Sequence, residues 1–385
     1  MSLRIFLLFN LIIISACNKE QPSLVEQKNA IDDISEISSD NFKTEKRKVS
    51  RKIYDDKELR EIYSKKASFW PKPEIDSDIE HKEIGNIEEI PYPKDNLYTE
   101  DKYNLGRLLF SEGKLSKTGG MSCLSCHNPN NYFNDSLQTS IGIDMKPLKR
   151  NSPTIINSSH YTSMFWDGRA KTLEEQAKAV LQNPREMDSS EELIIKNLSE
   201  SPLYKSLFKK AFGDESISLD KTAKAISTFE RTIVTKNKSN FDLFIKGKKD
   251  ALSDSQVRGM HIFRTSGRCI NCHNGTNFSD NKFHNIGLVL KDTKYEDLGR
   301  VLITNQASDY GVFRTPSLRN IVKTAPYFHN GLLINLKGLI NMYSNGMPNS
   351  QNKSKHIIPL GLETKEREDL IEFLSSLSEE IVTRK

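Results

Sequence analysis

The feature that most constrains this chain is a five-residue pattern that occurs twice, Cys-x-x-Cys-His. It spans residues 123–127 (CLSCH) and residues 269–273 (CINCH). Two thiols three positions apart reach both vinyl groups of one haem, and the histidine that follows projects its imidazole onto the iron. The pattern therefore predicts two covalently attached haem c groups. The expected attachment residues are Cys123, Cys126, Cys269 and Cys272, and the expected iron ligands are His127 and His273.

Two other kinds of site use closely spaced cysteines, namely a zinc knuckle and a CxxC redox pair. Zinc would use the two cysteine pairs jointly and would not need a histidine directly after each pair. Repetition of the complete pattern in one chain favours haem over both alternatives. Each iron then has one histidine ligand and an unassigned sixth position. That position decides whether a haem transfers electrons or performs chemistry.

The fifth cysteine, Cys17, ends a segment with the features of a secretory signal. Arg4 precedes an apolar run over residues 5–14 that is too short to span a bilayer, and small residues stand directly before Cys17. The arrangement matches a bacterial lipoprotein cleavage box, so residues 1–17 are expected to form a signal peptide that ends in a lipidated Cys17. An ordinary signal peptide with an incidental cysteine is the alternative. Asn18 favours the outer membrane, with the mature protein in the periplasm.

The remaining sequence predicts a mainly α-helical protein. The net charge of +5 is small and evenly spread, which argues against a nucleic-acid partner. Residues 18–68 are polar and charge-mixed, so we expect a flexible linker, a disordered tether that holds the protein off the membrane. Two cytochrome c-like haem domains, residues 69–238 and 239–385, are expected to pack together. Ser253 and Gln256 predict a capping box for the helix that enters the second motif.

Six further segments are distinctive: residues 165–169 (FWDGR), 173–177 (LEEQA), 183–187 (NPREM), 297–300 (DLGR), 314–320 (RTPSLRN) and 325–331 (APYFHNG). In these segments the chain resembles the bacterial dihaem cytochrome c peroxidase family, leaning to its MauG-like branch. The resemblance covers roughly residues 88–378. It implies a peroxidatic haem in the N-terminal domain, at His127, and an electron-transfer haem in the C-terminal domain, at His273.

The resemblance also implies roles for residues outside the two motifs. Gln176 and Glu186 match the distal-pocket residues, where a carboxylate shuttles the peroxide proton and an amide orients the peroxide. Trp166 matches the aromatic residue that conducts charge between the haems. A calcium ion at the domain junction is implied by matches to its ligands, which are Asn151, Thr324 and Pro326.

Two positions depart from the reductively activated peroxidases of this family. Those enzymes have a loop histidine that blocks the peroxidatic iron, and Ile143 stands in its place here. Because isoleucine cannot ligate iron, we expect an iron that is open to peroxide in the oxidised protein. Met145 is the alternative ligand from the same loop. The distal ligand of the second haem, methionine in typical peroxidases, falls on Tyr343, as in the MauG-like branch, although its neighbour Met342 stays open as an alternative.

The resemblance implies an enzyme of the cytochrome-c peroxidase class. It would reduce hydrogen peroxide at the His127 haem and pass oxidising equivalents through Trp166 to the His273 haem and an external donor. That donor would be a small periplasmic c-type cytochrome or cupredoxin. One alternative is a MauG-like peroxide-dependent oxidase of a protein or small substrate, and another is a dihaem electron carrier or redox sensor. The lipid anchor is the only expected membrane contact, and a homodimer is compatible with the sequence.

Overall fold

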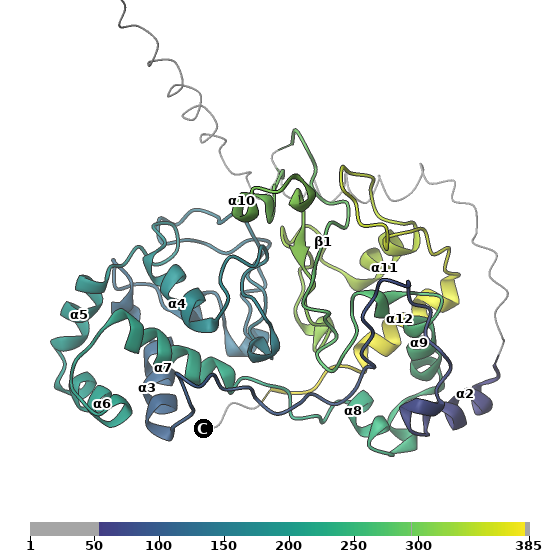
Figure 1. Ribbon diagram of the computed structural model, residues 1–385, viewed down its shortest axis with the longest axis horizontal. Helices are drawn as coiled ribbons and strands as arrows, with labels where there is room; N and C mark the ends of the chain where they lie inside the picture. Colours follow the sequence, from purple (N-terminus) through teal and green to yellow (C-terminus); the bar gives the residue numbers. More distant parts are fainter. Residues whose placement is uncertain (1–53, 294, 382–385) are drawn as a thin grey trace, which may run out of the picture.

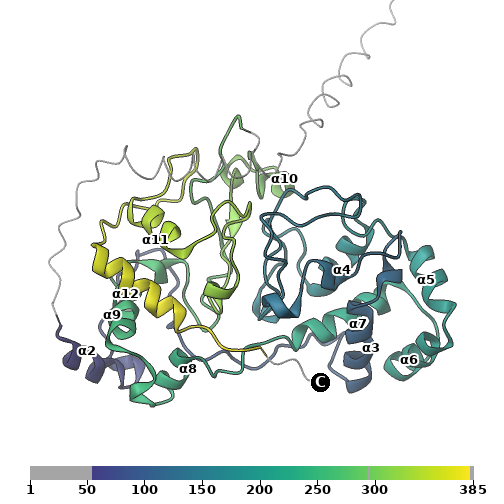
Figure 2. The ribbon, with the colours of Figure 1, turned by 180° about the vertical axis from the view of Figure 1, so that it is seen from behind.

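The computed structural model describes residues 54–293 and 295–381, which form two helical lobes side by side (Figures 1 and 2). The N-terminal lobe contains α3–α7 and the C-terminal lobe contains α8, α9, α11 and α12, with the short α10 above the junction of the lobes in Figure 1. Within the described residues, no helix is long and apolar enough to cross a membrane. The helices are α2 (Asp56–Tyr63), α3 (Glu100–Phe110), α4 (Leu173–Gln182), α5 (Glu191–Ser199), α6 (Pro202–Phe212), α7 (Leu219–Arg231), α8 (Asn240–Ile245), α9 (Asp254–Arg264), α10 (Val301–Thr304), α11 (Leu336–Ser344) and α12 (Thr364–Ser375). The strands β1 (Phe283–His284) and β2 (Phe313–Arg314) pair antiparallel.

Each lobe is built on a crossing between the helix that precedes its Cys-x-x-Cys-His motif and a later helix. In the N-terminal lobe α3 crosses α7, and in the C-terminal lobe α9 crosses α12. A glycine lies at each crossing. A Cβ atom on Gly106 would lie 1.9 Å from the carbonyl oxygen of Ala225, and one on Gly259 would lie 1.9 Å from that of Asp369. The absence of a side chain therefore lets each pair of helix backbones approach closely.

The hydrophobic residues divide into two large cores. One core runs from Tyr103 to Ile233 and fills the N-terminal lobe, and the other includes Phe241 and the helices α9, α11 and α12. The chain passes from the first core to the second between α7 and α8. The helix α9 begins with the expected capping box, in which Ser253 and Gln256 exchange hydrogen bonds between side chain and backbone.

The expectation of a flexible linker up to residue 68 is wrong for its described part. Residues 56–63 form α2, which packs against α9 and buries Leu59 and Tyr63. Trp70 also belongs to the C-terminal core, so the first described residues belong to the C-terminal lobe rather than to the N-terminal domain. The polar composition of this segment hid the helix. Two apolar residues four positions apart are enough to form a stripe that packs against a neighbouring helix. The expected signal peptide, with Cys17, and residues 18–53 lie outside the described residues.

Both ends of the described chain cross between the lobes. The segment after α2 runs beneath the molecule to α3, and the segment after α12 returns to the N-terminal lobe (Figures 1 and 2). There Ile381 packs against the N-terminal core. On the way, the Glu379 carboxylate accepts hydrogen bonds from the backbone N–H groups of Lys236, Lys238 and Ser239, in the connection between the lobes. Together with the connection between α7 and α8, these two crossings join the lobes by three segments of the chain.

Candidate active site

Both Cys-x-x-Cys-His motifs fold into the same local structure. A 3₁₀ turn covers Cys123–Ser125 in the first motif and Cys269–Asn271 in the second. The backbone N–H of His127 donates to the carbonyl of Cys123 at 2.9 Å, and that of His273 donates to the carbonyl of Cys269 at 2.8 Å. Each turn therefore places two thiols and one imidazole on a single short loop.

Hydrogen bonds fix the tautomer of both histidines. Nδ1 of His127 lies 3.1 Å from the carbonyl oxygen of Phe133, and Nδ1 of His273 lies 3.0 Å from that of Phe278. A carbonyl oxygen only accepts, so Nδ1 carries the proton and Nε2 keeps its lone pair. Burial also lowers the pKa of each histidine, which favours the neutral form. A neutral imidazole with a free Nε2 is the donor that iron requires.

The cysteines fit thioether attachment better than zinc. All four thiols are free of disulfide bonds. Among the described residues, one group of histidine, cysteine and acidic side chains is close enough to share an ion, and it consists of Cys272, Asp280 and His284. That group does not join the two cysteine pairs, as the zinc alternative would require. The residues present therefore fit two haem groups, each with its own histidine and its own pair of thiols.

Glu186 lies in the same site as the first motif. It follows α4, where its backbone N–H donates to the carbonyl of Asn183 at 3.0 Å. One carboxylate oxygen, Oε2, is buried without a hydrogen-bond partner among the described residues. Burial raises the pKa of Glu186, while Arg169 opposes that shift. Burial also raises the pKa of the Cys126 thiol to about 11, with a contribution from the Glu186 charge, which places this carboxylate close to the attachment turn.

Gln176 and the loop that lacks a histidine both precede the Glu186 segment in sequence. Gln176 is half-buried on α4 and makes no hydrogen bond with Glu186 among the described residues. The loop packs directly on the segment of Glu186, because the backbone N–H of Ile143 donates to the carbonyl of Arg185 at 3.2 Å. The side chain of Met145 is 80% exposed, so it points away from the protein interior.

Trp166 lies at the junction of the lobes. Its indole N–H donates to the carbonyl of Asn151 at 2.9 Å, and its own carbonyl accepts from the backbone N–H of Arg314 in the C-terminal lobe at 2.8 Å. The backbone N–H of Asn151 in turn donates to the carbonyl of His329 at 2.8 Å. The indole is therefore held between residues of both halves.

The three residues expected to bind calcium surround the same junction. Asn151 is buried, and its side-chain N–H donates to the carbonyl of Leu137 at 2.9 Å, which leaves the amide oxygen as the group for a cation. The Thr324 hydroxyl donates to the carbonyl of Ile321. Pro326 lies three residues before His329, the residue that accepts the Asn151 backbone bond. The structure thus brings Asn151 beside the segment that contains Thr324 and Pro326, and oxygen donors of this kind suit calcium.

Tyr343 lies near the thiols of the second attachment motif. Tyr343 and Met342 are both on α11. Burial raises the pKa of the Tyr343 phenol, and the charges of the Cys272 and Cys269 thiols add to the shift, so the phenol is near both thiols. Met342 is buried in the C-terminal hydrophobic core, and Tyr343 packs against the same core. Neighbouring helical positions point about 100° apart, so this arrangement favours Tyr343 as the distal residue.

Two polar residues near the motifs were not expected from the sequence. Glu230, on α7, is buried, and its charge contributes to the raised pKa of the Cys123 thiol. His284 lies 2.8 Å from Asp280, and its ring nitrogen lies within 4.8 Å of the Cys272 sulfur. No local pattern marks either residue, because both reach the attachment turns through tertiary packing.

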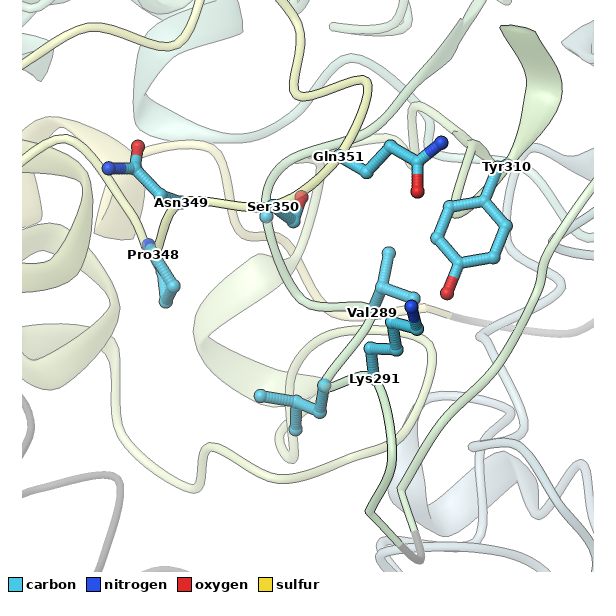
Figure 3. A pocket seen from close by; sticks show the side chains of 9 residues that line it. Val289, Lys291, Tyr310, Pro348, Asn349, Ser350 and Gln351 are labelled. Atoms are coloured by element: carbon cyan, nitrogen blue, oxygen red, sulfur yellow. The ribbon is translucent and has the colours of Figure 1, made fainter. Parts of the chain in front are cut away.

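A surface pocket of the C-terminal lobe contains none of these residues. It has a volume of about 140 Å³, and Figure 3 shows the side chains of Lys291, Tyr310 and Gln351 among those around it. Small-molecule sites are typically about 300 Å³ or larger. We therefore place the candidate chemistry at the two attachment motifs and the junction between them.

Comparison with known proteins identifies the family of this chain. The sequence model of the family described as di-haem cytochrome c peroxidase matches residues 100–250. The cytochrome-c peroxidase IdrP1 of Pseudomonas sp. (strain SCT) is 34% identical over 77% of this chain and 86% of its own length. The chain belongs to the dihaem cytochrome c peroxidase family. It is accordingly an enzyme of the cytochrome-c peroxidase or MauG type, with c-type haem as its cofactor.

Members of the MauG branch are as similar to the chain as the peroxidases are. The methylamine utilization protein MauG of Methylorubrum extorquens is 36% identical over 76% of this chain and 82% of its own length. The crystal structure of a MauG-like protein associated with microbial copper homeostasis superposes with a TM-score of 0.71 and 30% identity, over 80% of this chain and 96% of that one. The family is therefore established, and its two branches are not separated by similarity alone.

Proposed function

We propose that this protein is a periplasmic, lipid-anchored dihaem peroxidase that reduces hydrogen peroxide at the His127 site and draws electrons through the His273 site from a small external donor. The observation that carries the proposal is Glu186. Its buried oxygen without a partner lies near the Cys126 attachment turn, and the adjacent loop offers isoleucine where a blocking histidine would stand. A buried, unpaired carboxyl beside an open site is the arrangement that proton transfer to and from peroxide requires.

The residues of the N-terminal site divide the work of peroxide reduction. When bound, the haem supplies the iron at which peroxide is reduced. His127 would hold the iron through its neutral Nε2. Glu186 removes the proton from the near peroxide oxygen and returns it to the far oxygen, which leaves as water. The amide of Gln176 orients the peroxide, and two protons and two electrons complete its conversion to two water molecules.

Electrons reach this site from the other lobe. Trp166 is held by hydrogen bonds to Asn151 and Arg314, one on each side of the junction, so it is the residue we assign to conduct charge between the haems. A calcium ion bound by Asn151, Thr324 and Pro326 would fix the loops around this indole. The donor we propose is a small c-type cytochrome or cupredoxin. The domains meet near residue 238, where the chain leaves the N-terminal core.

A MauG-like oxidation of a protein or small substrate is the second candidate function, and Tyr343 favours it. The phenol near Cys269 and Cys272 occupies the place of a methionine ligand in typical peroxidases. Anionic oxygen ligands stabilise oxidised iron, whereas a methionine ligand raises the haem potential. If Tyr343 is the ligand, the haem at the C-terminal site would have a lower potential. A role for that haem as a high-potential electron acceptor is then less favoured.

Electron paramagnetic resonance of the fully oxidised holoprotein tests the open site. We expect a high-spin ferric signal, together with oxidation of reduced cytochrome c by peroxide without any prior reduction of the enzyme. Two low-spin signals alone would contradict the proposal and point to an electron carrier.

Tyr343→Met should raise the potential of one haem, while the matched variant Met342→Leu should leave both potentials unchanged. Slow turnover with every small donor, together with a long-lived oxidised state, would favour the MauG-like function.

A further inference from the structure

A cluster of aromatic rings joins α2 and α9 on the outer side of the C-terminal lobe. The ring of Tyr63 lies 5.4 Å from that of Trp70 and 5.9 Å from that of His261, measured between centroids. The ring of Tyr54 lies 5.3 Å from that of His261. Tyr63 and Trp70 are both buried, whereas Tyr54 and His261 are half-buried. The four rings therefore form a continuous line from the core toward the surface.

The hydrogen bonds of Tyr63 have a defined direction. The guanidinium of Arg264 lies 3.1 Å from the phenolic oxygen, and Nδ1 of His261 lies 2.9 Å from it. A guanidinium has no acceptor, so Arg264 donates to the phenolic oxygen. In the His261 tautomer that carries its proton on Nε2, Nδ1 accepts the proton of the phenol. The tyrosine hydroxyl is thus already aligned with a basic nitrogen that can receive its proton.

The cluster also lies along the second attachment motif. The chain that follows Trp70 is bonded to the end of α9 and to the attachment turn. The backbone N–H of Glu74 donates to the carbonyl of Arg264 at 2.9 Å, and the Asn271 side chain accepts from the backbone of Asp76 and donates to the carbonyl of Glu74, each at 2.9 Å. Trp70 belongs to the hydrophobic core against which Cys269 packs, and its ring lies 5.1 Å from the guanidinium of Arg264, five residues before Cys269. The structure thus connects the Trp70 segment to the helix end and the turn that carry the second motif.

We propose that Trp70 and Tyr63 form a redox relay for the C-terminal haem site, in which Tyr63 gives up an electron and passes its phenolic proton to His261. The proposal rests on the peroxidase function proposed above, because peroxide supplies the oxidising equivalent. One electron moves from the Tyr63 phenol through Trp70 to the oxidised haem site. The O–H bond breaks, the proton binds Nδ1 of His261, and a neutral tyrosyl radical remains. An electron from the external donor and the proton from His261 then restore the phenol.

Electrostatics explain why the proton must move with the electron. Burial raises the pKa of Tyr63 to about 12, so the phenol is protonated before oxidation. Loss of an electron alone would leave a positive charge beside Arg264, whose side chain is fully buried and paired with Glu83. A second buried positive charge is costly in a medium of low dielectric constant. Transfer of the proton to the half-buried His261 moves that charge toward solvent.

Freeze-quench electron paramagnetic resonance of the full-length holoprotein tests the relay. The oxidised protein is mixed with peroxide and no donor, with either ordinary or ring-deuterated tyrosine incorporated. We expect a tyrosyl signal that narrows on deuteration, is lost in Tyr63→Phe, and persists in Tyr103→Phe, a buried tyrosine of the N-terminal lobe. Radical formation should be slower in D₂O, and His261→Gln should abolish this solvent effect, because glutamine cannot take up the proton.

The outcomes separate this relay from the peroxidase function on which it rests. Peroxide consumption is followed optically in the same samples. Consumption with an unchanged tyrosyl signal in Tyr63→Phe, or with no tyrosyl signal in the unaltered protein, would overturn the relay and leave the peroxidase function intact. If peroxide is not consumed, the peroxidase function fails. Hexachloroiridate(IV) then replaces peroxide in the same comparison, and loss of the signal in Tyr63→Phe again decides for the relay.

Discussion

Glu186, which is half-buried, and Glu230, which is buried, are carboxyls of the N-terminal lobe, and burial raises the pKa of each. Each has a buried oxygen, Oε2, without a hydrogen-bond partner among the described residues. They differ in position, because Glu186 lies near Cys126, whereas Glu230 lies near Cys123 and beside the ion pair of Glu174 with Arg231. Glu186 was identified by its place in the segment of residues 183–187. Only its burial identified Glu230, because a glutamate on a helix is usually solvated.

Glu186→Gln should abolish most peroxide turnover while haem attachment is retained. The amide keeps the size of the side chain but cannot carry the proton between the peroxide oxygens, and general acid–base catalysis contributes about 10²–10⁴-fold. The rate of peroxide consumption at saturating donor measures the loss. Glu175→Gln is the matched control, because Glu175 is exposed on the neighbouring helix and should lose less than about twofold. Equal rates for Glu186→Gln and the control would exclude proton transfer by Glu186.

Glu230→Gln should change how stability depends on pH. Burial raises the pKa of Glu230 to about 8 in the folded protein, against an ordinary value of 4.5. The folded state therefore binds the proton more tightly, and its contribution to stability is complete below pH 4.5 and is lost as the pH rises to about 8. Glutamine stays neutral, so the stability of the variant relative to the natural protein should rise by about 4 kcal/mol between pH 5 and pH 9. Denaturant unfolding at both pH values measures this, and parallel pH profiles would contradict it.

The same element arrangement appears in both lobes, and its helix crossings depend on glycine. The sequence predicted the helix that enters the second motif, and this helix is present as α9. The helix crossings were not predicted, because the residues on either side of a helical glycine do not show which other helix packs against it. The helix α2 was missed for a related reason, since its stability comes from α9 rather than from its own composition.

Gly106→Ala and Gly259→Ala should each destabilise the protein by about 2 kcal/mol or more. The new methyl group would lie 1.9 Å from a backbone carbonyl oxygen, so the crossing helices must separate. Thermal unfolding of each variant provides the measurement. Gly85→Ala is the control, because the nearest atom to its added methyl group lies 3.6 Å away. A melting temperature equal to that of the control would show that the crossings tolerate a side chain.

At the scale of the whole molecule, the two lobes are joined by polar contacts at the junction and by crossed chain ends. Arg150 binds both carboxylate oxygens of Asp297 in the other lobe, at 2.6 and 2.8 Å, and Asp167 in its own lobe at 2.6 Å. Trp166 is adjacent to Asp167 in sequence and bonded to both lobes. The geometry of charge transfer therefore depends on how the lobes are held.

Arg150→Ala should destabilise the protein by about 3–5 kcal/mol and slow electron transfer between the haems. The loss of the guanidinium leaves the carboxylates of Asp167 and Asp297 buried without their shared partner. Denaturant unfolding gives the stability change, and stopped-flow absorbance gives the transfer rate. Lys117→Ala breaks the exposed ion pair with Asp188 and should cost less than about 1 kcal/mol. Similar losses in the two variants would argue against a structural role for the Arg150 pairs.

The sequence by itself determined the two attachment turns, the family and the candidate distal residues. Those features are local: a thiol pair and a histidine on one turn specify haem attachment wherever the turn is placed, as at Cys123 and Cys126 with His127. Three features came from the three-dimensional packing: Tyr343 lies near the thiols of the second motif, Glu186 has a buried oxygen without a partner among the described residues, and residues 54–70 belong to the C-terminal lobe. Burial and ring contacts such as that of Tyr63 with His261 depend on helices distant in sequence. The pattern of one segment therefore cannot specify them.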